Sequence, residues 1–285
     1  MLLKSLLVIS LLPVIAVAAA VAWGSSRWKA GTLELRQQLD ARRVPVVPKS
    51  VDLAELDGLP PVVQRHLRTA LKQRQPMLAA VSVEHQGSFN LGETGTNWKP
   101  FTSTQRVVTR RPGFDWDARI RVMPGLTVKV HDAYVGGEGI LHATLAGLFT
   151  LAELRGSGAI AEGELMRFLA EAAWYPTALL PSQGVRWEGV DERSARATFS
   201  DGALTLSLLF SFGDDGLIER IAAQSRGRTV GGEVVATPWQ ARMWNYVERD
   251  GMLIPLEGEV AWLLPQGPAP YWRGRITRID YEFAR

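Results

Sequence analysis

Residues 163–181 read GELMRFLAEAAWYPTALLP, a segment that begins as a helix and ends in aromatic residues and prolines. On a wheel of 100° per residue, Glu164, Arg167 and Glu171 share a ridge only about 60° wide. Apolar side chains cover most of the remaining circumference. A helix that is apolar nearly all round is a buried one, so this segment predicts a helix inside the fold.

The end of this helix carries an unusual group of side chains. Pro176 disfavours helical geometry at Tyr175, so we expect the helix to end there. Trp174 and Tyr175 each carry one polar atom that needs a partner, and Thr177 adds a hydroxyl. The simpler interpretation is aromatic packing at a helix end. The alternative is a ligand cleft that these residues line together with the two helix carboxylates.

On both sides of this helix the apolar pattern has a period of two. In FDWDARIRV, residues 114–122, Trp116 and Ile120 fall on one face, whereas Asp115 and Asp117 fall on the other and are expected to face solvent. Comparable segments separated by Gly, Pro and Asp predict about ten antiparallel strands. Because so long a sheet curls, the expected fold is α+β: a curved antiparallel sheet, a half-barrel or open barrel, wrapped around one buried helix.

The N-terminus carries a membrane-targeting signal. Lys4 precedes an apolar run over residues 6–23 that includes the small residues 16–20. A cleaved signal peptide and an uncleaved anchor helix both fit, and the length favours the anchor. The rest of the chain is then tethered to the membrane on its extracytoplasmic side, in the periplasm or cell envelope. The predicted organisation is residues 1–24 as signal anchor or signal peptide, 25–58 as polar helix and Pro-punctuated linker, and 59–285 as a single α+β domain.

The polar helix after the anchor, residues 32–43, has two interpretations. Arg36, Arg42 and Arg43 would contact anionic lipid if the helix lay on the membrane. The favoured interpretation is a stalk surrounded by solvent.

Composition excludes several classes of protein. The 285 residues carry a net charge of +3 without a basic, aromatic-rich block, so nucleic acid is not an expected partner. Cysteine is absent, which removes disulfides, thiol catalysis and thiolate metal sites. The four histidines show no ligand spacing and are interpreted as surface or incidental residues, so neither a metal nor a cofactor is expected.

The last predicted strand supplies the remaining candidates. In PYWRGRITRIDYEF, residues 270–283, regular alternation turns Arg273 and Arg275 toward the interior, where Glu164 or Glu171 would pair with them. A β-bulge that turns both arginines outward is the alternative. The candidate ligand-binding residues are therefore Glu164, Arg167, Glu171, Trp174, Tyr175, Thr177, Trp272, Arg273 and Arg275.

Four segments together resemble one known family: PGFDWDARI, the helix segment above, GVRWE and YWRGRITRIDYEF. The family consists of bacterial, often membrane-anchored proteins known only as a domain of unknown function, and WYPTALLP is its most specific string. The resemblance runs from about residue 59 to the C-terminus and implies neither an activity nor catalytic residues. The predicted architecture is also similar to the half-barrel of periplasmic lipoprotein carriers, a likeness of fold that does not fix function.

These observations favour a cell-envelope protein that binds a lipid or other amphiphile without catalysis. The acyl chain of the ligand would lie inside the fold, and its anionic head group would lie at a rim of Trp and Arg. An envelope hydrolase that uses Glu164 and Glu171 is one alternative. A structural or partner-binding envelope module is the other. Whether the protein is an enzyme stays open.

Overall fold

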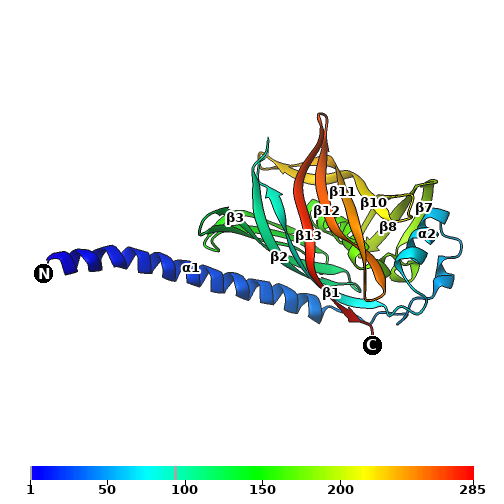
Figure 1. The fold of residues 1–285 in the computed structure, drawn as a ribbon, viewed down its shortest axis with the longest axis horizontal. Helices are drawn as coiled ribbons and strands as arrows, with labels where there is room; N and C mark the ends of the chain where they lie inside the picture. Colours follow the sequence, from blue (N-terminus) through cyan, green and yellow to red (C-terminus); the bar gives the residue numbers. More distant parts are fainter. Residues whose placement is uncertain (1, 93–94) are drawn as a thin grey trace.

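The structure, a computed structural model, describes residues 2–92 and 95–285, with side chains described from residue 15 onward. Within these residues, three α-helices and thirteen strands form the fold (Figure 1). The helices are α1 (Leu2–Ala41), α2 (Pro61–Ala70) and α3 (Ala159–Glu171). The strands are β1 (Leu78–Asn90), β2 (Trp98–Val108), β3 (Gly113–Met123), β4 (Leu126–Val135), β5 (Glu138–Leu145), β6 (Phe149–Gly156), β7 (Arg186–Asp191), β8 (Ser194–Asp201), β9 (Leu204–Phe212), β10 (Ile218–Val230), β11 (Glu233–Arg249), β12 (Met252–Leu264) and β13 (Gly267–Phe283).

All thirteen strands belong to one antiparallel sheet, in the order β6-β5-β4-β3-β2-β1-β13-β12-β11-β10-β9-β8-β7. The sheet is open, with β6 and β7 as its edges. The first and last strands in the chain, β1 and β13, pair in its middle. The predicted α+β class and open antiparallel sheet are confirmed, but the predicted count of about ten strands is too low. The missing strands include β5 and β6 at one edge of the sheet: burial does not alternate along β5, and no residue of β6 is buried.

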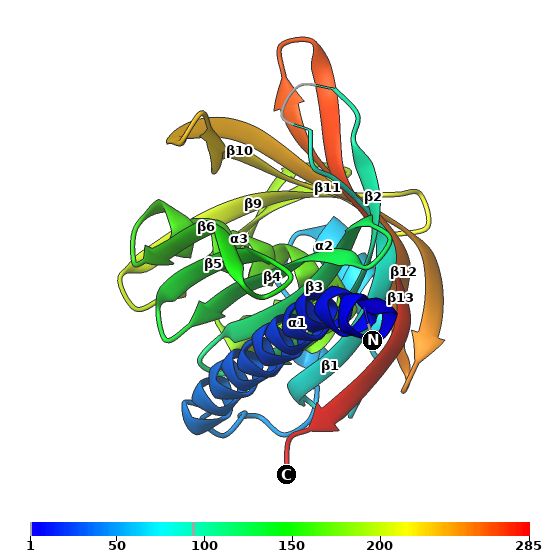
Figure 2. The same cartoon turned by 90° about the vertical axis from the view of Figure 1, so that its left-hand side faces the viewer.

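Helix α3 lies inside the curve of the sheet (Figure 2). It contacts β3, β4, β5 and β6 from one side of the sheet and β9 and β10 from the other. Leu165, Phe168 and Leu169 are at most 2% exposed, which confirms the predicted burial of the helix. Strand β5 approaches the helix so closely that a Cβ on Gly139 would lie 2.5 Å from the carbonyl carbon of Ile160. Only glycine fits at that crossing.

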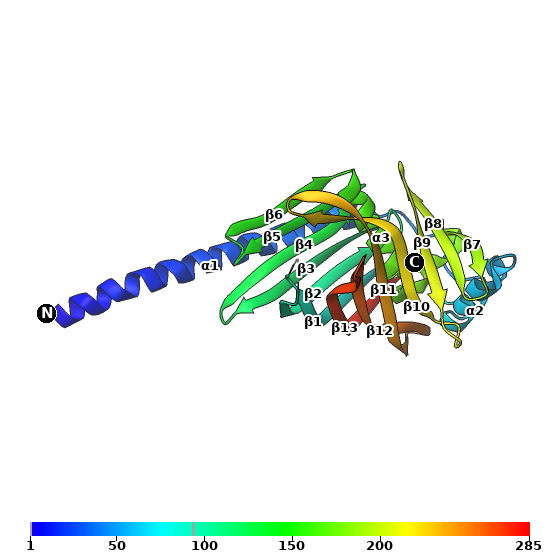
Figure 3. The same ribbon diagram turned by 90° about the horizontal axis from the view of Figure 1, so that it is seen from above.

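Helix α1 runs well beyond the sheet at its N-terminal end, and its C-terminal half packs on the outer face of β2, β3 and β4 (Figure 3). In the part of the chain that the structure describes, no helix combines the length and the apolar character needed to cross a membrane. The predicted anchor, residues 6–23, lies partly outside the residues whose side chains are described. It stays a prediction.

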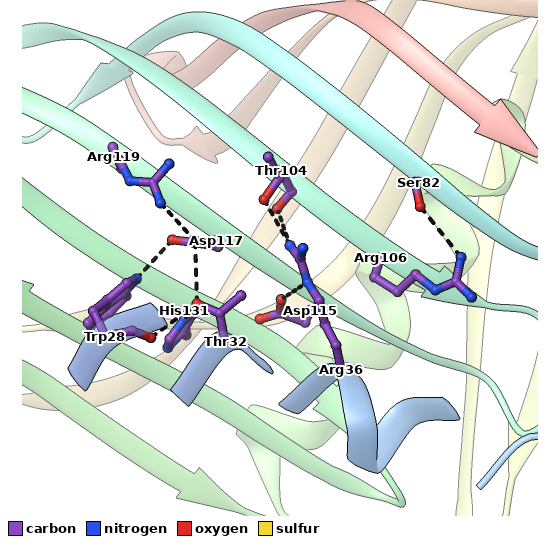
Figure 4. Close-up of polar contacts among 10 residues, drawn as sticks. All are labelled: Trp28, Thr32, Arg36, Ser82, Thr104, Arg106, Asp115, Asp117, Arg119 and His131. Carbon is purple, nitrogen blue, oxygen red and sulfur yellow. Dashed lines mark hydrogen bonds and ion pairs between the residues drawn. The ribbon is translucent and has the colours of Figure 1, made fainter. Parts of the chain in front are cut away.

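Helix α1 makes polar contacts with the sheet (Figure 4), and several of the side chains involved, including Trp28, Thr32 and His131, are buried. Trp28 Nε1 donates to Asp117 Oδ1 at 2.9 Å, and Thr32 Oγ1 lies 2.7 Å from His131 Nε2. Arg36 Nε donates to Asp115 Oδ2 at 3.0 Å. The favoured interpretation of residues 32–43 as a solvated stalk is therefore wrong, because these side chains are bound by the sheet.

The same contact corrects the expectation that Asp115 and Asp117 face solvent. Both aspartates lie on the outer face of β3, as the alternation predicts, but α1 covers that face and leaves them 0% and 3% exposed. Burial raises the pKa of Asp115 to about 7, although Arg36 acts in the opposite direction. Burial also lowers the pKa of His131 to about 4.

Candidate functional site

A cavity of about 440 Å³ lies beside helix α3, inside the curve of the sheet. Strands β3, β4 and β5 form one wall with apolar residues such as Ile120, Val130 and Leu141. Strands β11, β12 and β13 form the opposite wall, with Met243 and Trp272 among its residues. The site is therefore an apolar pocket between two halves of one sheet.

The cavity reaches the surface near Leu91 and Leu151, which line it and are 38% and 56% exposed. Arg242 and Glu259 also belong to its lining. Exposed leucines at a cavity that opens to solvent indicate a place where an apolar ligand can enter.

Arg167 is the first of two buried arginines in this wall. Its Nη1 donates to Asp132 Oδ2 and its Nε to Glu171 Oε1, each at 2.6 Å. The guanidinium carbon lies 4.8 Å from the ring centroid of Phe114 and 4.9 Å from that of Trp116. Two carboxylates thus neutralise Arg167 and hold it against the aromatic rings.

Arg226 is the second buried arginine, and its contacts are looser. Its Nη2 lies 3.4 Å from Glu164 Oε1, and its Nη1 lies 3.4 Å from the hydroxyl oxygen of Tyr271. Its guanidinium carbon lies 5.2 Å from the ring centroid of Trp239, whose Nε1 donates to Tyr271 at 2.9 Å. Glu164 Oε2 has no hydrogen-bond partner among the described residues. Burial, reinforced by the charge of Asp132, raises the pKa of Glu164 to about 8.

Two of the predicted site residues have structural contacts instead of a place on the cavity wall. Tyr175 is fully buried and donates its hydroxyl to the carbonyl oxygen of Phe168 at 2.6 Å. Thr177 accepts a hydrogen bond at 3.2 Å from the backbone N–H of Leu78 in β1. Helix α3 ends at Glu171, earlier than expected, but a 3₁₀ turn over Ala172–Trp174 carries helical geometry on to Tyr175, where the following proline predicts that it stops. For these two residues the contacts favour the simpler interpretation, packing at a helix end.

Four of the predicted residues do line the cavity: Arg167, Glu171, Trp174 and Trp272. The two oxygens of Glu171 are engaged by Arg167 and by Gln105 Nε2, the latter at 2.5 Å. Glu164 lies behind this wall, where it contacts Arg226.

The predicted ion pair between the helix carboxylates and Arg273 or Arg275 does not form. Arg273 Nε donates to Glu259 Oε2 at 2.7 Å and is 54% exposed, and Arg275 lies against Gln86. The register between β1 and β13 shifts between the pairs Glu84–Arg278 and His85–Ile276, leaving Thr277 unpaired as a β-bulge. The bulge turns Ile276 inward and the arginines outward, which is the alternative left open from the sequence. The strand does reach the helix end, because Tyr281 donates to the carbonyl oxygen of Trp174 at 2.7 Å.

Sequence reasoning missed Arg226, and a second bulge explains why. Ala223 pairs with Trp239 and Arg226 pairs with Thr237, so Gln224 and Ser225 both face Pro238 of β11. Proline cannot donate a hydrogen bond to the neighbouring strand, and the ladder is broken there. The extra residue moves Arg226 from the outer face to the inner one. Pro238 in the middle of an alternating segment was the available signal.

Three of the four histidines are buried, which corrects their predicted surface positions. His66, His85 and His131 are at most 4% exposed, and burial lowers the pKa of His66 to about 4 and that of His85 to about 3. Within residues 2–92 and 95–285, no group of three or more His, Cys, Asp or Glu has the arrangement of a metal site.

The fold and site define an α+β protein whose open antiparallel sheet encloses an apolar cavity beside one helix. The chain belongs to the family of unknown function DUF6920, which matches residues 57–281 and confirms the resemblance carried by WYPTALLP. No curated protein matches the chain in sequence.

Two solved structures are similar to this chain. A LolA superfamily protein from Nitrosomonas europaea has 10% identity and a TM-score of 0.42, covering 78% of this chain and 92% of its own. A beta-barrel-like protein of the domain of unknown function DUF1849 from Brucella abortus has 10% identity and a TM-score of 0.21, covering 72% of this chain and 99% of its own. With TM-scores below 0.5, these similarities are too distant to support a conclusion about function.

Proposed function

We propose that this protein binds a lipid or other amphiphile in the cavity beside α3, without catalysing a reaction. The observation that carries the proposal is the apolar cavity itself. Its volume of about 440 Å³ falls within the range of about 300–1,000 Å³ typical of small-molecule sites. An apolar wall with a few buried polar groups suits a ligand with a long chain and one polar end.

The two alternative functions have less support. A hydrolase would need a free carboxylate pair in the cavity, but both oxygens of Glu171 are engaged and Glu164 lies behind the wall. A purely structural module would fill its interior with side chains, whereas this one leaves room beside α3.

The membrane anchor and the extracytoplasmic location belong to the same proposal. They rest on Lys4 and the apolar run over residues 6–23. Cell fractionation of the full chain with a C-terminal tag tests the anchor. A soluble mature form that begins near Val21 or Ala22 would replace the anchor with a cleaved signal peptide.

Native mass spectrometry of the detergent-extracted protein tests ligand binding. We expect a co-purifying mass that disappears when Ala143→Trp or Met243→Trp fills the cavity from opposite walls. Val190→Trp, at a half-exposed position on β7 away from the cavity, is the control and should keep that mass. Loss of the mass in the control variant, or its retention in both cavity variants that remain folded by circular dichroism, would contradict binding in this cavity.

A further inference from the structure

The two buried arginines beside the cavity are unequally neutralised. Arg167 has two carboxylate contacts at 2.6 Å, whereas Arg226 has one at 3.4 Å. The side chain of Arg226 is only 10% exposed. A buried guanidinium with long contacts retains capacity to donate, since it carries five N–H groups.

The surroundings of Arg226 present it to the cavity. The bulge opposite Pro238 turns it inward, and the ring of Trp239 supports its flat face. Arg226, Trp239 and Tyr271 all belong to the cavity wall. Tyr271 can also donate its hydroxyl to an oxygen bound there, because Trp239 already donates to it.

We propose that Arg226 binds the anionic head group of a single-chain amphiphile, a carboxylate in the simplest case, with the chain lying along the apolar walls. This inference rests on the proposed function and adds the class of ligand to it. It also moves the head group from the rim, where the sequence predicted it, to the interior. A guanidinium binds a carboxylate through two parallel hydrogen bonds, which makes the contact specific for such heads.

Glu164 competes with the ligand for Arg226. The charged and titratable groups that act on Glu164 are Arg226 from β10, Asp132 from β4, and Arg167 and Glu171 from α3. The neutral acid leaves Arg226 available, whereas the ionised acid pairs with it and repels an incoming anion. Because the pKa of Glu164 is raised to about 8, affinity for an anion should fall as the pH rises through about 8.

The test compares dodecanoate with dodecanol, which has an alkyl chain of the same length and a neutral head group. Each ligand is titrated against the full-length protein in non-ionic detergent, and displacement of Nile red from the cavity is measured. For the unaltered chain we expect dodecanoate to displace the dye at a concentration at least about tenfold lower than dodecanol, as one charge-assisted contact predicts. Arg226→Met should remove this preference while dodecanol binding persists. Arg186→Met, which changes an exposed arginine on β7 away from the cavity, is the control and should keep it.

Two further variants control for misfolding and test the competition between Glu164 and the ligand for Arg226. Arg226→Met combined with Glu164→Gln removes both partners, so no buried charge is left alone, and it should also lack the preference. Glu164→Gln alone should keep the preference and lose the pH dependence above pH 8. If both ligands displace the dye equally from the unaltered chain, the cavity binds apolar chains and Arg226 is not the head-group site. If neither ligand displaces the dye, the proposed function itself fails.

Discussion

Substitution of Asp115 by Asn should change how stability depends on pH. Asp115 is 0% exposed beneath α1, and its pKa rises from 3.8 to about 7. The folded protein therefore holds this proton more tightly than the unfolded chain does. The resulting stabilisation is fully present below pH 3.8 and is lost as pH rises to about 7.

The size of the effect follows from that interval. Roughly three pH units at about 1.4 kcal/mol each give on the order of 4 kcal/mol. Because asparagine does not titrate, the unaltered chain should lose about this much stability relative to Asp115→Asn between pH 4 and pH 8. The buried histidines and Glu164 titrate in both proteins, so their contributions cancel in the difference.

Urea unfolding followed by tryptophan fluorescence at a series of pH values measures this difference. The control is Asp57→Asn, an aspartate whose side chain is 74% exposed in its contact with Arg68, and its profile should parallel that of the unaltered chain. Parallel profiles for Asp115→Asn as well would show that α1 does not bury this carboxyl in solution. The packing of α1 on β2, β3 and β4 would then be refuted.

Three further experiments test the interior, the ion pair on α3 and the pairing of β1 with β13. Phe168→Ala should cost about 3–5 kcal/mol in urea unfolding, because the side chain is 2% exposed, and a loss below about 1 kcal/mol would place α3 at the surface. Gly87→Ala should lower the midpoint of thermal unfolding, since a Cβ there would lie 2.0 Å from the carbonyl oxygen of Arg273; an unchanged midpoint would mean that β1 and β13 are farther apart. A double-mutant cycle of Glu171→Gln with Arg167→Met should give a coupling of about 1–3 kcal/mol, whereas Glu171→Gln with Arg273→Met should be additive; the reverse result would restore the ion pair that the structure lacks.

Periodicity predicted those parts of the fold that depend on local burial. The burial of α3 follows from its apolar circumference, and the assignment of side chains to the two faces of β3 follows from the alternation around Trp116. The helix end follows from Pro176. Each of these features depends on residues within a single helix or strand, so the sequence of that segment is enough to predict it.

The features that could not be predicted depend on partners far apart in the sequence. Asp115 and Asp117 do lie on the outer face, but only the position of α1 decides that this face is covered. Arg226 reaches the cavity because a proline on another strand disrupts the ladder, and Arg273 turns outward because a bulge lies at Thr277. A bulge of one residue exchanges the two faces of a strand, so a regular alternation predicts the wrong face beyond it.

The pairing of β1 with β13 also sets the order in which this protein can be assembled. Every other adjacent pair in the sheet joins strands that are neighbours along the chain, so each can form as a hairpin while synthesis proceeds. The central pair joins residues 78–90 to residues 267–283 and must wait until almost the whole chain has emerged. Until then two half-sheets exist, each with an unpaired inner strand and exposed apolar residues that can join another chain. We therefore expect slow folding, a need for protection during synthesis, and aggregation of chains that stop before β13.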